Sequence, residues 1–335
     1  MKKLALLLLL ATPLHATFSI VARDPATGQL GVAVQSHWFA VGQIVPWAEA
    51  GVGAVATQSF VDPSYGKLGL DLLRAGKSAP ETLRALLGGD AGCEVRQVGI
   101  IDASGNVATF TGSKDIIAAG AIANAGTPES NKCGALSVGR DFAVQANLMA
   151  NDKVWPAMAK AYAESKGDLA ERMLAALDAA QAAGGDIRGK QSAALIVVNV
   201  KTSGRSWQDR VFDVRVDDHA EPLAELRRLV TLQRAYNHMN AGDLAVEHKD
   251  HEAALREYSA AEAIAGKTAG VPKSRIAEMT YWHAVALVNM NRMNEALPLF
   301  SRAFAMEPSW RELTPRLAKS GLLPEDAVAR IVAAR

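Results

Sequence analysis

Short apolar runs bounded by turn residues alternate with amphipathic stretches over the first two thirds of the chain. Residues 17–23 (TFSIVAR) and 30–36 (LGVAVQS) are two such runs, and the segment between them, DPATG, has strong turn chemistry. Two apolar runs joined in this way predict a β-hairpin. By the same criteria, further strands are predicted over residues 51–58, 95–103, 106–112, 192–200 and 209–216.

Helices are predicted between these strands, where apolar residues recur at helical spacing. Asp62-Pro63 is a typical helix start, with aspartate as the N-cap and proline at the first helical position. Residues 78–81 (SAPE) form a capping-box pattern ahead of a second helix. Two more helices are predicted over about 152–165 and 168–183. Alternating pairs of strands and helices predict an α+β fold with two antiparallel sheets stacked between helical layers.

The pattern changes past about residue 217, because from Pro222 onward only Ala- and Leu-rich helical segments are predicted. Two stretches of this part, about 235–264 and 277–310, repeat at an offset of about 42 residues. Their spacing resembles the tetratricopeptide pattern, in which small residues let two helices approach closely. We therefore predict a small all-α repeat domain over residues 221–335. The matching positions are Gly242, Ala245, Ala254, Tyr258 and Ala261 in the first copy and Ala284, Leu287, Ala296, Phe300 and Ala303 in the second.

The first sixteen residues have the features of a cleavable secretion signal. Two lysines precede an apolar run from Leu4 to Ala11, Pro13 ends the run, and Ala16 is the small residue that a signal peptidase prefers. The residue at the −3 position, Leu14, is larger than ideal. The segment predicts export to the periplasm of a bacterium or secretion from it. No second apolar run of about 20 residues follows, so we expect no stable membrane anchor.

A cut after Ala16 makes Thr17 the first residue of the mature chain. An N-terminal threonine carries a nucleophilic hydroxyl and a base, its own α-amine, on one residue. A hydrolase of this kind also needs donors for the oxyanion of the tetrahedral intermediate. The ends of two predicted strands are the natural places for them, namely Gln58-Ser59 and Ser36-His37. The alternative is that Thr17 is first merely because a signal cut must leave some residue there.

Charge and cysteine content narrow the classes of function and partner. The chain has 36 basic and 35 acidic residues, a net charge of +1, so no overall field favours nucleic acid or an anionic membrane. The two cysteines, Cys93 and Cys133, are equally compatible with one disulfide and with two buried thiols. Two groups of residues carry side chains that can ligate a metal ion. We interpret the first, Asp217-Asp218-His219, as a solvated linker, and the second, His248 with His251, as a surface pair rather than a zinc site. We expect no metal ion and no organic cofactor.

Four stretches of the chain resemble DUF1028, a family placed in the N-terminal nucleophile (Ntn) hydrolase superfamily. The resemblance extends from Thr17 to about Val230, and it implies a four-layer αββα sandwich for residues 17–220. Members without a signal begin Met-Thr-Phe-Ser, so export cleavage here would replace removal of methionine. The family's substrate is not established. The stretches are residues 17–59, 98–113 (VGIIDASGNVATFTGS), 184–198 (GGDIRGKQSAALIVV) and 209–230 (DRVFDVRVDDHAEPLAELRRLV).

The leading hypothesis from the sequence is an exported amidohydrolase. Thr17 would attack an amide or related acyl carbon of a small molecule or peptide, and backbone N–H groups near Gln58-Ser59 would hold the oxyanion. The helical repeats would dock a peptide, another protein or a second copy of the chain. The alternative is a non-catalytic scaffold whose repeat domain carries the function.

The two hypotheses predict different surroundings for Thr17. The enzyme hypothesis places its hydroxyl in an open cleft between the sheets, whereas the scaffold hypothesis buries it under apolar side chains. Occlusion by residues 1–16 alone would not distinguish them. Asp186 and Arg188 either stiffen their Gly-rich loop as an ion pair or line the rim of the site.

Overall fold

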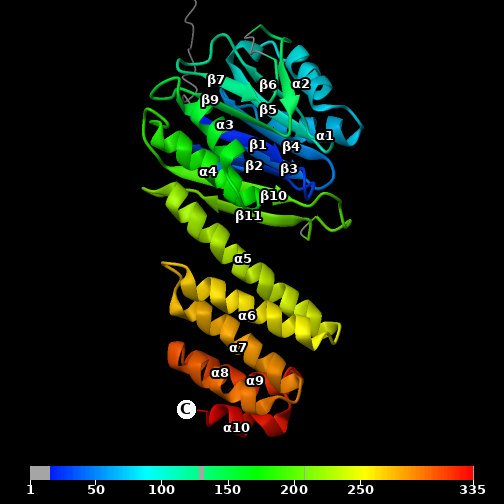
Figure 1. The fold of residues 1–335 in the computed structure, drawn as a ribbon, viewed down its shortest axis with the longest axis vertical. Helices are drawn as coiled ribbons and strands as arrows, with labels where there is room; N and C mark the ends of the chain where they lie inside the picture. Colours follow the sequence, from blue (N-terminus) through cyan, green and yellow to red (C-terminus); the bar gives the residue numbers. More distant parts are fainter. Residues whose placement is uncertain (1–15, 128–131, 207, 335) are drawn as a thin grey trace, which may run out of the picture. The chain divides into compact units, whose positions relative to one another are not determined.

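The computed structural model describes residues 16–127, 132–206 and 208–334 (Figure 1). Of the predicted signal, residues 1–16, only Ala16 lies within this part. The chain divides into two compact units, the first ending at Leu226 and the second comprising Arg227–Arg335. All strands of the described residues belong to the first unit. The second unit is helical.

The first sheet, sheet A, has six strands in the order β11-β10-β2-β1-β9-β7, and every pair of neighbours is antiparallel. The hairpin predicted from the first two apolar runs forms the middle of this sheet as β1 and β2. The strands are β1 (Thr17–Arg23), β2 (Leu30–Ser36), β7 (Gly120–Ala123), β9 (Phe142–Asn147), β10 (Ser192–Val198) and β11 (Arg210–Val216).

The second sheet, sheet B, has five antiparallel strands in the order β3-β4-β5-β6-β8. Its central hairpin, β5 and β6, is the one predicted on either side of Ser104-Gly105. The strands are β3 (Pro46–Glu49), β4 (Gly53–Ser59), β5 (Arg96–Asp102), β6 (Asn106–Thr111) and β8 (Ser137–Arg140).

Two helices cover the outer face of each sheet, so the first unit has four layers. Helices α3 (Val154–Glu164) and α4 (Leu169–Ala182) pack on sheet A, and α1 (Ser64–Arg74) and α2 (Ala79–Gly88) pack on sheet B (Figure 1). The start of α2 follows its sequence signal, because the Ser78 capping box is present. Helix α1 begins one residue later than predicted, since Pro63 rather than Asp62 is its N-cap and the Asp62 carboxylate accepts from the backbone N–H of Ser64. The prediction of a mixed α+β fold with two stacked antiparallel sheets is therefore confirmed.

The space between the sheets is apolar through its middle. Inward-facing valines, alanines and isoleucines of both sheets form one buried cluster that includes Val21, Val32, Ala54 and Ile101. Such burial stabilises the stacked sheets by about 25 cal/mol for each Å² of apolar surface removed from water. At the end of the sandwich where β1 begins, polar side chains replace the apolar ones.

A disulfide between Cys93 and Cys133 settles the alternative that the sequence left open. Cys93 begins the short 3-10 helix η2 (Cys93–Val95), just before β5, and Cys133 lies in the loop before β8. The bond joins cysteines that are 40 residues apart, and closing a loop of that length stabilises a fold by about 2–4 kcal/mol.

The second unit contains antiparallel helices with two apolar cores. Helix α5, which begins before the boundary between the units, carries Gly242 against the ring of Tyr258 in α6. A Cβ on this glycine would lie 3.0 Å from the ring, so the small residue permits the close approach. The helices are α5 (Pro222–Glu247), α6 (His251–Lys267), α7 (Lys273–Asn289), α8 (Met293–Met306), α9 (Ser309–Lys319) and α10 (Val328–Val332). Over the described residues, no helix has the length and apolarity needed to span a bilayer.

Candidate functional site

Two rows of polar side chains face each other at the end of the sandwich where β1 begins. In sheet A, Asn147, Thr17, Ser36 and Ser192 are register partners on the adjacent strands β9, β1, β2 and β10. Register partners in an antiparallel sheet share a face, and this face is the one toward sheet B. In sheet B the opposing row consists of Gln58, Gln97 and Thr111 on β4, β5 and β6.

Gln97 is the centre of the hydrogen bonds that join the two rows. Its side-chain oxygen accepts from Gln58 Nε2 at 2.7 Å and from Asn147 Nδ2 at 2.9 Å. Its side-chain nitrogen donates to Thr111 Oγ1 and to the carbonyl of Ala146, both at 2.9 Å. The amide therefore uses both its donor and its acceptor capacity inside the fold, as a buried polar group must to avoid a large desolvation cost.

Thr17 is held from three sides within this network. Gln58 Nε2 donates to its carbonyl oxygen at 3.0 Å, and Asn147 Nδ2 is 3.5 Å from the same oxygen. Its hydroxyl Oγ1 lies 3.0 Å from Ser36 Oγ. Because the single hydroxyl hydrogen of Ser36 is directed at the carbonyl of Ala16, Thr17 is the donor in this pair.

The carbonyl oxygen of Ala16, which precedes Thr17, accepts two hydrogen bonds. Ser36 Oγ donates to it at 2.5 Å, and the Arg188 guanidinium donates to it at 3.0 Å. The peptide bond that a signal cut would break is thus polarised at its oxygen by a hydroxyl and a cation. A cationic donor makes the stronger kind of hydrogen bond.

Asp186 fixes the position of Arg188. Its carboxylate accepts from Arg188 Nε at 3.1 Å and from the terminal nitrogen NH2 at 2.9 Å, which is the two-point geometry of an arginine–carboxylate pair. It also accepts from the backbone N–H groups of His37 and Arg188, each at 2.9 Å. The side chain of Asp186 is fully buried. The pair therefore stiffens its loop, as one of the two sequence-based interpretations expects, and Arg188 also reaches the carbonyl of Ala16.

The other residues predicted for the site lie around this network in different roles. Gln58 contacts Thr17 through its side-chain amide. Ser59 has a φ of 70° and donates its hydroxyl to Asp115 at 2.6 Å. His37 contributes its backbone N–H to Asp186, while its imidazole lies close to Gly189.

Thr17 is 1% exposed with the chain before it still attached. The open cleft expected from the enzyme hypothesis is thus not present around the uncut chain. The groups that contact Thr17 are polar, unlike the apolar cover expected from the scaffold hypothesis. Ala16 itself is 0% exposed and occupies the space beside the threonine.

Sequence reasoning missed Gln97 and Asn147 as members of the site. Gln97 is the one amide of β5, whereas Asn147 shares β9 with Gln145, and both Gln97 and Asn147 occupy inward-facing positions near a strand end. The signal available in the sequence was an uncharged polar residue at a position whose side chain faces the buried side of its strand. This signal does not show which amides of different strands contact one another.

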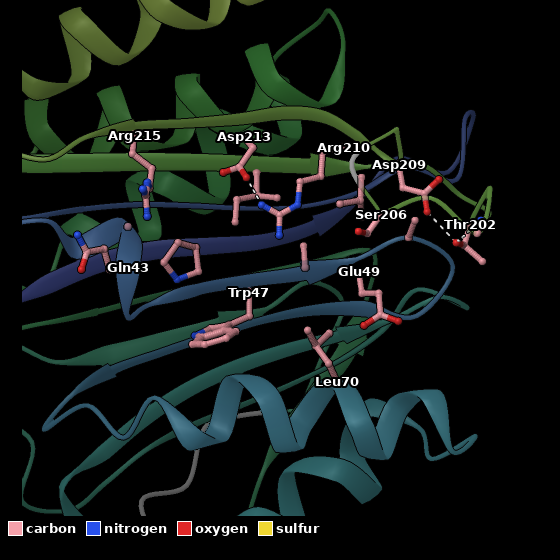
Figure 2. A pocket seen from close by; sticks show the side chains of 17 residues that line it. Gln43, Trp47, Glu49, Leu70, Thr202, Ser206, Asp209, Arg210, Asp213 and Arg215 are labelled. Atoms are coloured by element: carbon pink, nitrogen blue, oxygen red, sulfur yellow. Dashed lines mark hydrogen bonds and ion pairs between the residues drawn. The ribbon is translucent and has the colours of Figure 1, made fainter.

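A separate groove of about 910 Å³ lies along the edge of the sandwich, between β11 and β3 (Figure 2). Strand β11 is the edge of sheet A and β3 the edge of sheet B, and it is the next strand of sheet A, β10, that packs on β3. Arg210, Asp213 and Arg215 of β11 form one wall, and Trp47 and Glu49 of β3 form the other. None of the residues predicted for the site lines this groove.

The charges of the groove are matched mostly by neighbours on the surface. Arg210 pairs with Asp213, and Glu49 accepts from Arg74 Nε at 2.9 Å. Arg210, Asp213 and Arg215 are all exposed. Over the described residues, no cluster of three or more His, Cys, Asp or Glu side chains is arranged to hold a metal ion.

Comparison with known proteins places the first unit in a family. The family model of DUF1028, a family of unknown function, matches residues 17–226, so the matched region begins at Thr17. The crystal structure of protein SPO2555 from Silicibacter pomeroyi, also assigned to DUF1028, is 28% identical to this chain with a TM-score of 0.54. The similarity covers 64% of this chain and 84% of that one. A search of curated proteins finds no match. The chain belongs to the DUF1028 family.

Proposed function

We propose that this protein is an exported Ntn-type hydrolase that cleaves an amide or a related acyl bond with Thr17 as its nucleophile. The observation that carries the proposal is the position of Thr17. It begins β1 within one of the two facing rows of polar side chains, with its hydroxyl 3.0 Å from Ser36 Oγ. The start of the family match at this residue is in agreement with a mature chain that begins there.

The proposed reaction needs the free α-amine that a cut after Ala16 creates. The Thr17 hydroxyl gives its proton to this amine while its oxygen forms a bond to the acyl carbon. The carbon–nitrogen bond of the substrate then breaks, and the ammonium group returns the proton to the leaving amine. Water repeats the sequence on the acyl-enzyme and releases a carboxylic acid.

Neighbouring donors would stabilise the oxyanion of the tetrahedral intermediate. We assign this role to backbone N–H groups near Gln58-Ser59, where the left-handed backbone of Ser59 turns the chain out of β4. Export is part of the proposal, because the signal must be removed to free the amine. The four-layer arrangement of helices and sheets agrees with the αββα sandwich of Ntn hydrolases.

We further propose that the second unit is a tetratricopeptide-like docking domain for a peptide, a protein partner or a second copy of the chain. The contact between Gly242 and Tyr258 supports this, because the repeat pattern places a small residue where paired helices approach. If the first unit is a non-catalytic scaffold, this domain alone carries the function.

The first experiment is to determine the N-terminus of the exported protein by mass spectrometry. We expect a chain that begins at Thr17. The purified chain is then treated with a β-lactone or epoxyketone probe, which reacts with an N-terminal hydroxyl nucleophile. We expect one adduct on the wild type, none on Thr17→Ala and retained labelling on Thr17→Ser, since serine keeps the hydroxyl.

The control variant is Thr57→Ala, which removes a buried hydroxyl of β4 that does not contact Thr17. It should label like the wild type, with circular dichroism showing that every variant is folded. A mature chain that starts at another residue, or a Thr17→Ala variant that labels normally, would refute the nucleophile.

A further inference from the structure

Removal of residues 1–16 exposes two donors that share one acceptor in the uncut chain. The Ser36 hydroxyl and the Arg188 guanidinium both donate to the carbonyl oxygen of Ala16. Ser36 is the last residue of β2, and Arg188 is clamped by the buried carboxylate of Asp186. Arg188 therefore keeps its direction when Ala16 leaves, and the Ser36 oxygen stays beside it. We call this pair of donors the Ala16 oxygen site.

The same cut adds a third group to the Ala16 oxygen site. The nitrogen of Thr17, bonded to the Ala16 carbonyl in the uncut chain, becomes a free amine. In its protonated form it is a cation, so a cation and two hydrogen-bond donors converge on the space that Ala16 occupied. The negative charge of Asp186 is already paired with Arg188.

We propose that the Ala16 oxygen site of the mature chain binds the carboxylate of an N-acyl amino acid with a small side chain. One carboxylate oxygen takes the place of the Ala16 carbonyl oxygen, between Ser36 and Arg188. The other oxygen lies toward the Thr17 ammonium. A carboxylate can accept a charge-assisted hydrogen bond from each of the three donors, the Ser36 hydroxyl, the Arg188 guanidinium and the Thr17 ammonium.

The small side chain follows from Ala16 itself. A residue with only a methyl side chain occupies this place beside Ser36 and Arg188 in the uncut chain. Because an acid with this structure is what amide hydrolysis releases, the inference extends the proposed function. It indicates that the substrates are peptides or N-acyl amides with a small residue on the acyl side, and that the product acid competes with them.

The test uses N-acetyl-L-alanine as the probe and N-acetyl-L-alaninamide as the uncharged control. The protein is the mature chain, expressed as Met followed by Thr17 and checked by mass for loss of methionine. Calorimetric titration near pH 7 should show binding of the acid and at least tenfold weaker binding of the amide. The full chain with residues 1–16 attached should bind the acid at least tenfold more weakly, since Ala16 fills the site.

Two arginine variants localise the binding. Arg188→Gln should weaken binding of the acid roughly tenfold or more, because a hydrogen bond to a charged group is worth about 1.5–3 kcal/mol. Arg215→Gln is the matched control on the wall of the separate groove, and it should leave the affinity unchanged. If Arg188→Gln does not fold, Arg188→Lys and Ser36→Ala test the same contact and should each weaken binding severalfold.

Several results would overturn the inference. These are equal affinities for acid and amide, unchanged affinity in the folded Arg188 and Ser36 variants, or equal binding by the uncut chain. A failure of the hydrolase proposal can be told apart from a failure of this inference, because the mature Thr17→Ala chain keeps the amine, Arg188 and Ser36. It should still bind N-acetyl-L-alanine although it cannot be labelled at a hydroxyl.

Discussion

The end of the sandwich at Thr17 and the groove beside β11 are both polar, but they differ in how their groups are satisfied. At the Thr17 end, buried amides and hydroxyls bond to one another, and Gln97 alone joins five partners. In the groove, exposed side chains form ion pairs on the surface, as Arg210 does with Asp213. The groove is wide, whereas the Thr17 end is filled by the chain itself.

The difference shows that the open groove of a protein and its network of buried, hydrogen-bonded polar side chains need not lie in the same place. Buried polar groups are costly unless they are satisfied, so a closed network of them fixes its members in place. Exposed charges in water contribute little to stability and tolerate many geometries. The polar groups at the Thr17 end are therefore held in fixed positions, whereas those of the groove are not.

The largest expected effect comes from removing the central amide of the network. Gln97→Ala would leave the Gln58 and Asn147 nitrogens without their shared acceptor and would open a buried cavity. We expect a loss of about 3–5 kcal/mol in the free energy of unfolding of the first unit. Hydrogen exchange of the β5 and β9 amides, read residue by residue, measures this loss.

The matched control for Gln97 is Gln43→Ala, which removes an exposed amide from the lining of the groove. Its effect should stay within about 0.5 kcal/mol, as at most surface positions. If the two variants destabilise the unit equally, the contrast between the network and the groove is wrong.

A smaller loss is expected at the carboxylate that holds Arg188. Asp186→Ala removes the acceptor of two backbone N–H groups and of the guanidinium, so we expect a cost of about 2–4 kcal/mol. Asp213→Ala, the exposed aspartate of the groove, should cost less than about 1 kcal/mol. Urea titration of both variants by circular dichroism makes the comparison, and equal shifts of the midpoint would contradict it.

Much of the fold follows from the sequence, because long apolar strands and capped helices leave local signals. The hairpin of β1 and β2 and the start of α2 are examples. Strands β3, β7, β8 and β9 were not predicted. The first three have four residues each, and the Ala- and Gly-rich sequence around β7 and β8 has little β-propensity of its own. Pairing with neighbouring strands, which the sequence does not reveal, determines their structure.

Only those residues of the site that carry a signal in the adjacent sequence could be predicted. Thr17 stands out because of the signal before it, and Ser36 and Gln58 stand out as polar ends of predicted strands. Gln97 joins them from 39 residues beyond Gln58, through the stacking of two sheets. That distance in sequence is bridged by the tertiary fold, so no spacing rule could assign the contact.

The smallest expected effect is the response of the ion pairs of the two regions to salt. This response distinguishes the buried network from the exposed groove most directly. A double-mutant cycle on Arg210 and Asp213 should give a coupling of at most about 1 kcal/mol that falls toward zero in 1 M salt, where screening acts within about 3 Å. The cycle on Arg188 and Asp186 should give a larger coupling that changes little, because one partner is fully buried and salt cannot screen it there. Neutral replacements, Arg→Gln and Asp→Asn, keep the side-chain sizes similar in both cycles. If salt weakened both couplings alike, the Arg188 pair would be a surface contact, and the rigid donor beside Thr17 would lose its basis.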